Sequence, residues 1–183
     1  MSDKIFSALC FATNAHTGQF RKSTQIPYIV HPIDVMQRLI KCGASTDAIV
    51  AGILHDTLED TPTSADDLRT VFGNRITDLV IGASEPDKSL SWPERKQHTI
   101  DALRETSDIE QLLVICADKL SNVSSIAADF QTCGTAVWSR FNRGYADQKW
   151  YYMSLAEIFA KHAKENALFA EYVATATSLF SLV

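Results

Sequence analysis

Three acidic side chains and a histidine follow directly on a strongly apolar segment in the first third of the chain. Residues 48–54 carry no charge and are typical of a buried helix, and the next six residues include His55, Asp56, Glu59 and Asp60. Residues four apart share a helix face, so these side chains form two adjacent polar stripes. Carboxylates crowded beside an apolar wall repel one another unless a cation lies among them. The stretch favours a divalent metal site over a solvated helix end before a turn.

The remainder of the chain is predicted to be helical. Only 7 glycines and 5 prolines occur in 183 residues, which is few for an all-β protein, and no stretch alternates convincingly like a strand. Apolar residues recur at helical spacing, with Ser45 as an N-cap for the helix that holds His55, and a long helix is expected from Trp138 to about His162. We therefore expect an all-α fold of about eight to ten helices, forming a single domain over residues 1–183.

A further acidic residue interrupts the apolar helix predicted over residues 109–126. Asp118 lies in its apolar wall, and Asn122 follows four residues later on the same face. An unpaired buried aspartate costs on the order of several kcal/mol, so it needs a cation or strong donors. Lys119 is one candidate, but adjacent helical residues diverge by about 100°. A metal ion is the better fit for Asp118.

Two segments before the acidic stretch carry further polar candidates. Arg21 and Lys22 lie together in a loop predicted over residues 17–27, where a basic pair alone indicates no more than solvent exposure. His31 precedes Pro32, which suits the first turn of a helix that ends near Gly43. His31 is therefore held on a defined backbone just before a helix, where a lone histidine is more often a cap or a packing residue.

Charge and composition exclude several classes of partner. The net charge of −5 argues against broad nucleic-acid binding, and no run of about 18 apolar residues predicts a membrane helix. The first residues lead into a mixed amphipathic segment and not into a secretory signal. The four cysteines form no CxxC pair and indicate free thiols in a reducing compartment. We expect a cytoplasmic protein, and its oligomeric state is left open.

The order His31, His55-Asp56, Asp118, spread over separate helices, resembles the HD superfamily of metal-dependent phosphohydrolases. More narrowly, several runs are similar to the hydrolase domain of Rel/SpoT stringent-response enzymes and to the stand-alone small alarmone hydrolases, including their metazoan members. The similarity spans roughly residues 5 to 160. The runs similar to the Rel/SpoT hydrolase domain are Gly18–Lys22, Pro27–Pro32, Leu54–Thr61 and Ala117–Asn122. Those similar to the stand-alone hydrolases are Asp87–Leu90, Glu94–Lys96 and Trp138–Arg143.

The resemblance implies a single HD-domain helical bundle that removes the 3′-pyrophosphate of (p)ppGpp, giving GDP or GTP. It implies one metal ion per chain, Mn²⁺ or another divalent transition metal, held by His31, His55, Asp56 and Asp118. Glu59 and Asp60 would activate water, and Asn122 would contact the ribose or a phosphate beside them. Arg21 would stack on the base of the substrate, and Lys22, Lys88 and Arg143 would contact its phosphates.

Two other functions stay open. Another HD phosphohydrolase, such as a (p)ppApp hydrolase or an NADPH 2′-phosphatase, needs the metal ligands but has no specific need for Glu59, Asp60 or Arg21. A non-catalytic nucleotide-binding module is less compatible with a complete ligand set and both acids. The segment Ser84–Asp87 departs from the usual pattern of the alarmone hydrolases, and this leaves the choice between guanine and adenine open.

Overall fold

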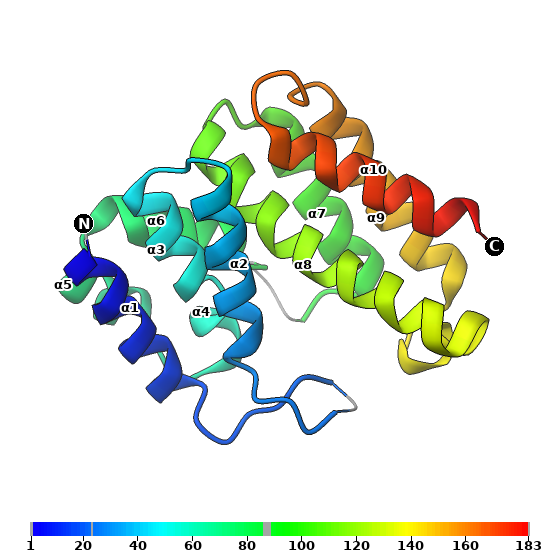
Figure 1. Ribbon diagram of the computed structural model, residues 1–183. Coiled ribbons are helices and arrows are strands. Elements are labelled where there is room, and N and C mark those ends of the chain that lie inside the picture. Colours follow the sequence, from blue (N-terminus) through cyan, green and yellow to red (C-terminus); the bar gives the residue numbers. More distant parts are fainter. Residues whose placement is uncertain (1, 23, 86–88, 183) are drawn as a thin grey trace.

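The computed structural model describes residues 2–22, 24–85 and 89–182, and this part of the chain is a bundle of helices joined by loops (Figure 1). Its only β-type pairing within these ranges is an isolated bridge between Phe20 and Pro27. None of the helices described is long and apolar enough to cross a membrane. The all-α prediction is confirmed. The helices are α1 (Ser2–Ala15), α2 (Val30–Lys41), α3 (Thr46–Leu54), α4 (Thr57–Asp60), α5 (Ala65–Phe72), α6 (Asn74–Ala83), α7 (Trp92–Glu105), α8 (Ile109–Cys133), the 3₁₀ helix η1 (Gly134–Arg140), α9 (Tyr145–Ala160) and α10 (Ala167–Ser181).

Helix α8 is the centre of the bundle and packs against α2, α3, α6, α9 and α10. In Figure 1 it crosses the molecule between α2 and α3 on one side and α9 and α10 on the other. Asp108 caps its start, with a side chain that accepts the backbone N–H groups of Glu110 and Gln111, and Gly134, where φ is 57°, caps its end. Its buried face is apolar except for Asp118 and Ser121, which therefore lie inside the core.

Helices α2 and α3 approach closely because α3 carries a glycine where they meet. A Cβ on Gly52 would lie 2.3 Å from Leu39 Cδ1 and 3.1 Å from Val35 Cγ1. The side chains of Leu39 and Val35 on α2 thus pack directly on the backbone of α3 at Gly52. Because His31 lies in the first turn of α2 and His55 follows α3, this approach brings the centres of the two imidazole rings within 5.1 Å.

The helix expected to hold His55 and Asp56 is interrupted at these two residues. Helix α3 ends at Leu54, residues 55 and 56 form a turn, and α4 begins at Thr57. Side chains take the carbonyls that a continuing helix would use: His55 Nδ1 donates to Gly52 O at 2.7 Å, and Thr57 Oγ1 donates to Leu54 O at 2.7 Å. The break re-aims the acidic residues that follow it.

The helix predicted from Trp138 to His162 is wrong in its first part. Residues Gly134–Arg140 form η1, and α9 covers only Tyr145–Ala160. The break falls at Gly144, which has φ −71° and ψ −172° ahead of α9, and glycine is a poor helix former. Trp138 of η1 stacks on Phe180 of α10 with ring centres 5.5 Å apart. This contact fixes η1 against α10.

The close approach at Gly52 predicts a cost for any side chain there. Gly52→Ala should lower the free energy of unfolding by about 1–2 kcal/mol, because overpacking against Leu39 outweighs the gain in helix propensity. Gly82→Ala in α6 is the matched control, since its new methyl group would meet only the end of the Gln111 side chain. Urea denaturation of both variants measures the difference, and equal stabilities would contradict the packing role of Gly52.

Candidate metal site and adjoining cavity

Two histidines and an aspartate from three separate segments converge in the core. His31 comes from α2, His55 from the turn after α3, and Asp118 from α8, and all three are buried. One potential ligand atom from each lies within 4.8 Å of the others. His31 Nε2 is 3.1 Å and His55 Nε2 is 3.6 Å from Asp118 Oδ1. Two imidazole nitrogens and a carboxylate oxygen form a donor set that suits Mn²⁺, Fe²⁺ or Zn²⁺.

The orientation of His55 fits a metal ion. Its Nδ1 faces the Gly52 carbonyl, which can only accept, so the Nδ1 atom carries a proton. Its buried Nε2 has no partner of hydrogen-bond geometry among the described residues, although Asp56 Oδ2 lies 2.9 Å away. Burial opposes a charge here, but Asp56 and Asp118 outweigh it and raise the pKa of His55 well above its ordinary value. The carboxylates therefore favour a cation at Nε2, which can be a proton or a metal ion.

The two oxygens of Asp118 have different partners. Oδ2 lies 2.7 Å from Lys119 Nζ, whereas Oδ1 faces the histidines and accepts from Asn122 Nδ2 at 2.7 Å. Burial works against the charged form, but Lys119 and His55 hold the pKa of Asp118 well below its usual range. Lys119 does therefore pair with Asp118, although the two residues are adjacent on the helix, contrary to the prediction from their divergence. The ion pair occupies one oxygen and leaves the other for the site.

Asp56 lies at the edge of this cluster. Its Oδ2 is 2.9 Å from His55 Nε2 and 3.6 Å from His31 Nε2, but it is not part of the compact set formed with Asp118. The phenol of Tyr28 donates to the same oxygen at 2.6 Å. Burial and the Asp56 carboxylate raise the pKa of Tyr28, so the phenol keeps its proton. A role for Asp56 as the fourth ligand stays a prediction.

The two further acids of the stretch lie on α4 in different surroundings. Glu59 Oε1 accepts the backbone N–H of Glu85 at 2.8 Å, and Asp60 Oδ2 is 3.5 Å from the hydroxyl of Tyr28. Burial and the negative charge of Asp56 raise the pKa of Glu59, against the effect of the Glu85 hydrogen bond. A carboxylate with a raised pKa, beside a candidate metal site, has the properties of a general base.

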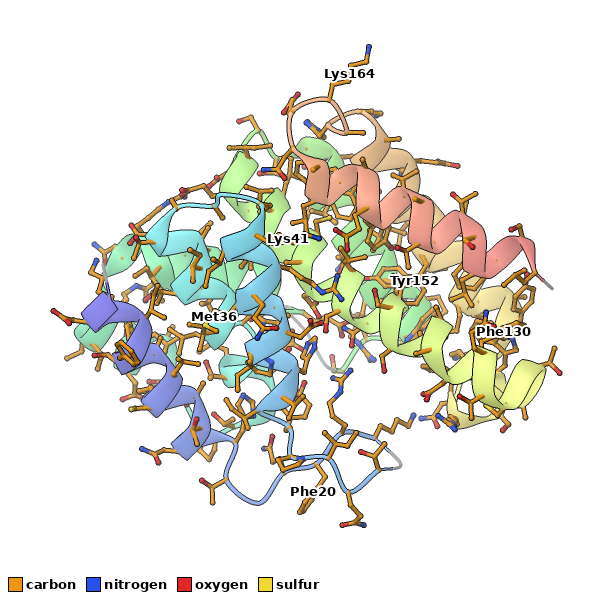
Figure 2. The ribbon with its side chains drawn as sticks, viewed as in Figure 1. Phe20, Met36, Lys41, Phe130, Tyr152 and Lys164 are labelled. Carbon is orange, nitrogen blue, oxygen red and sulfur yellow. The ribbon has the colours of Figure 1, made fainter. Side chains whose placement is uncertain are left out.

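The loop between α1 and α2 brings Arg21 to the cluster. Gln19 anchors the loop by donating from Nε2 to the Asp60 carbonyl at 2.6 Å, while the side chain of Phe20, 52% exposed, points away from the helices (Figure 2). Arg21 Nη2 then donates to Asn122 Oδ1 at 2.9 Å. Because Asn122 also donates to Asp118, a chain of hydrogen bonds runs from the loop to the metal site.

A cavity of about 400 Å³ opens beside Arg21. Aromatic rings contribute to its wall, including that of Tyr152, which lies between α8 and α10 in the view of Figure 2. Lys22 also lines it, with Nζ 5.9 Å from the centre of the Phe141 ring. The other predicted phosphate contacts are not placed there: Arg143 is exposed beyond the end of η1, and Lys88 lies outside the described residues. The full lining is Arg21, Lys22, Thr24, Ile26, Tyr28, Asn122, Ser125, Ile126, Asp129, Val137, Arg140, Phe141 and Tyr152.

Tyr28 and Ser121 were not assigned a role from the sequence, and Lys119 was weighed as a partner of Asp118 and set aside. Tyr28 bonds Asp56, Lys119 pairs with Asp118, and Ser121 Oγ lies 2.9 Å from His31 Nδ1. Tyr28 precedes His31 by three residues and could have been suspected from that spacing. Ser121 gives no such signal, because a serine on an apolar helix is commonly a residue that bonds its own backbone.

Comparison with known proteins identifies the family of this chain. The family model described as HD domain matches residues 8–144, so the chain belongs to the HD domain family. In this fold the segments that carry His31, His55-Asp56 and Asp118 are the ones that meet in the core.

Two curated relatives are similar in sequence to part of this chain. A guanosine-3′,5′-bis(diphosphate) 3′-pyrophosphohydrolase of Haemophilus influenzae is 34% identical over 122 residues, covering 64% of this chain and 18% of the relative. The bifunctional (p)ppGpp synthase/hydrolase SpoT of Escherichia coli K12 is 32% identical over 130 residues, covering 68% of this chain and 18% of SpoT. The chain thus spans less than a fifth of the length of these curated relatives.

Two solved structures share the fold. One, from Listeria monocytogenes, is 36% identical with a TM-score of 0.77. The alignment covers 82% of this chain and 99% of the Listeria chain. The other is a metazoan orthologue of SpoT described as hydrolysing ppGpp, 26% identical with a TM-score of 0.77, covering 100% of this chain and 96% of its own.

The convergent donor set predicts a stoichiometric metal ion. The purified wild-type protein should contain about one divalent transition metal per chain and melt at a lower temperature after chelation, because a ligand at 100 times its Kd stabilises by about 2.7 kcal/mol. Asp118→Asn should lose the metal, whereas Asp101→Asn, a change to a half-exposed side chain on α7, should keep it. Elemental analysis and thermal melts measure both effects. Equal metal content in all three proteins would contradict the site.

Proposed function

We propose that this chain removes the 3′-pyrophosphate of guanosine alarmones of the (p)ppGpp type. The observation that carries the proposal is the hydrogen-bonded chain from Asp118 through Asn122 to Arg21, which joins the candidate metal site to the ring-lined cavity. A nucleotide laid along it would have a phosphoryl group at the histidines and its base in the cavity. The names of the curated relatives and of the metazoan orthologue support this substrate class.

We assign the metal-holding role to His31, His55, Asp56 and Asp118, with one Mn²⁺ per chain. A divalent ion held there would polarise the phosphoryl group and lower the pKa of a nearby water molecule. Lys119 holds the second oxygen of Asp118, so the carboxylate is oriented before any ligand arrives. Tyr28 orients Asp56 in the same way through its phenolic hydroxyl.

Glu59 and Asp60 are proposed to take the proton of the attacking water. Hydrolysis breaks the bond between the 3′ oxygen and its phosphorus; the hydroxyl of water goes to the pyrophosphate and a proton reaches the 3′ oxygen. A carboxylate on α4 accepts the proton from water in this scheme. Asp60 is near Tyr28 and Asp56, while Glu59 is held by the Glu85 backbone, so the two acids flank the site.

The basic loop residues are proposed to bind the nucleotide. Arg21 lines the cavity, and its planar guanidinium would stack on a base there. Lys22 lines the same cavity and would contact a phosphate. Asn122 would contact the ribose or a phosphate. Lys88 and Arg143 are further proposed phosphate contacts that rest on the resemblance to alarmone hydrolases alone.

One incubation experiment tests this function against its alternatives. The protein with Mn²⁺ is mixed separately with ppGpp, ppApp, NADPH and common nucleotides, and the products are resolved by chromatography. We expect GDP and pyrophosphate from ppGpp. Preferential turnover of ppApp or NADPH would replace the guanine assignment by an adenine alarmone or a 2′-phosphate, and turnover of none would leave a binding module.

The four cysteines are free, which agrees with the cytoplasm that we propose as the location.

The acids of α4 should separate chemistry from binding. Glu59→Gln and Asp60→Asn keep the shape of each side chain, so both variants should retain Mn²⁺ and ppGpp binding. Their kcat should fall by about 10²- to 10⁴-fold, the usual contribution of a positioned general base. Metal analysis, calorimetry with ppGpp and pyrophosphate release are measured on the same preparations.

The pH profile provides the control for these variants. Glu59 accepts a proton only when ionised, and its pKa is raised by burial, so wild-type kcat should fall as the pH drops through that raised value. The Glu59→Gln variant should lack this acidic limb. Near-normal kcat in both variants, with an unchanged profile, would refute the acid–base role.

Arg21 is predicted to act in substrate binding. Arg21→Ala should raise KM for ppGpp while leaving metal content normal, because its guanidinium touches Asn122 and the cavity but none of the metal ligands. Arg21→Lys keeps the charge and loses the planar stacking surface, so it should recover only part of the affinity. Steady-state kinetics at saturating Mn²⁺ give both constants, and an unchanged KM in the alanine variant would disprove base stacking.

A further inference from the structure

The ring-lined cavity beside Arg21 contains an ion pair that the proposed function does not use. Asp129 on α8 and Arg140 at the end of η1 both line the cavity, with Asp129 Oδ2 2.6 Å from Arg140 Nη1. Nearly half of each side chain is exposed, 46% for Asp129 and 41% for Arg140, so a ligand in the cavity can reach both. Within the described part of the chain, Oδ1 of Asp129 has no hydrogen-bond partner. The pair therefore has hydrogen-bonding capacity left for a ligand.

Helix α8 sets the distance between this pair and the candidate metal site. Asn122 and Asp129 line the same cavity and lie seven residues apart, which places them on one face of the helix. Two helical turns separate them by about 10 Å along the axis. Asn122 is bonded to Asp118 and to Arg21. A nucleotide with its phosphoryl group at the metal site would therefore pass Asn122 with its ribose and direct the edge of its base toward Asp129.

The hydrogen-bonding groups of the pair match the Watson–Crick edge of guanine. That edge presents two donors, N1–H and the N2 amino group, beside the acceptor O6. A carboxylate only accepts and a guanidinium only donates, so Asp129 can take both donors while Arg140 donates to O6. Adenine presents one donor, the N6 amino group, beside the acceptor N1. It therefore gives the carboxylate a single partner and makes fewer bonds to the pair.

We infer that Asp129, held in place by Arg140, is a specificity-determining residue that selects guanine over adenine. The inference rests on the proposed function, which places the base in this cavity. A site built to pair with a polar group of its ligand binds an analogue without that group less well, because the site is left unpaired. Since the pair is half exposed, water can replace a missing partner. The preference is therefore expected at about 10-fold, toward the lower end for contacts that read a base.

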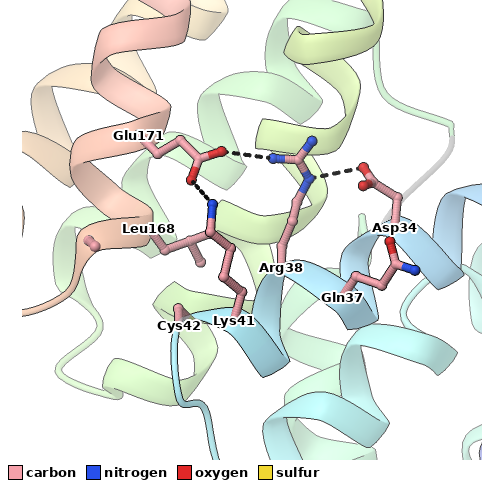
Figure 3. A pocket seen from close by; sticks show the side chains of 8 residues that line it. Asp34, Gln37, Arg38, Lys41, Cys42, Leu168 and Glu171 are labelled. Atoms are coloured by element: carbon pink, nitrogen blue, oxygen red, sulfur yellow. Dashed lines mark hydrogen bonds and ion pairs between the residues drawn. The ribbon is translucent and has the colours of Figure 1, made fainter.

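A second cavity, of about 290 Å³ between α2 and α10, supplies a matched control variant (Figure 3). Its Glu171 is 44% exposed and, like Asp129, is paired with an arginine, Arg38, at 3.4 Å. The other oxygen of Glu171 lies 3.4 Å from Lys41. None of the described residues that line this cavity also lines the ring-lined cavity. Glu171→Gln thus removes a comparable ion pair without changing the proposed base site.

Calorimetry with GDP, ADP and inosine diphosphate (IDP) tests the inference and needs no turnover. IDP keeps N1–H and O6 of guanine but lacks the N2 amino group. The wild type and Glu171→Gln should bind GDP about 10-fold more tightly than either IDP or ADP. In Asp129→Ala both preferences should fall to near unity, because GDP loses its extra bonds. Arg140→Ala keeps the carboxylate but not its support, and it should retain only part of the preference.

Turnover provides the second measurement. The ratio of kcat/KM for ppGpp to that for ppApp should fall in Asp129→Ala by the same factor as the GDP preference. If the ion pair only tethers η1 to α8, Asp129→Ala would weaken all three diphosphates equally and keep the wild-type preference. That result, or a wild type that prefers ADP, would overturn the inference. Failure of the proposed function has a different signature: no pyrophosphate released from ppGpp by a wild type that still prefers GDP.

Discussion

The structure depends on the balance of charge in its core. Two buried histidines and two carboxylates face one another where α2, the turn after α3, and α8 meet. Unpaired carboxylates in such surroundings would cost several kcal/mol each, so the arrangement is stable only with cations among them. Lys119 supplies one, and the remaining carboxylate oxygens favour another at the imidazole nitrogens. Folding of these helices and binding of a cation are therefore coupled.

The backbone makes this convergence possible. Gly52 lets α2 and α3 approach, and the turn at residues 55–56 points the His55 ring toward α8. The same glycine supplies the carbonyl that fixes the tautomer of His55, so one residue serves both the packing and the chemistry. The loop before α2 is tied to α4 by Gln19, which sets Arg21 beside the site although it is distant in sequence.

Much of this was predictable from the sequence because ligand spacing and apolar periodicity are local signals. His31, His55 and Asp118 were expected together, and they do converge. Lys119 was misjudged because the angle between adjacent helical residues describes where Cβ points, whereas a four-carbon side chain can bend back across that angle. The break before α9 was missed because apolar residues continue through η1, and tertiary contacts of Trp138 decide its path. Such contacts leave no periodic signal in the chain.

Three of the predicted metal ligands, His31, His55 and Asp118, each have one atom held by the protein and another directed into the site. For His31 and His55 the held atom is Nδ1, bonded to Ser121 and to Gly52. For Asp118 it is the oxygen beside Lys119. Helix α8 supplies much of this support because successive residues on a helix point about 100° apart. Within about one turn, α8 therefore directs the Asp118 carboxylate to the site, the Ser121 hydroxyl to His31 of α2, and the Asn122 amide to Arg21 in the loop. The protein contacts of each ligand therefore contribute, together with the cation, to ordering the ligands as the helices pack.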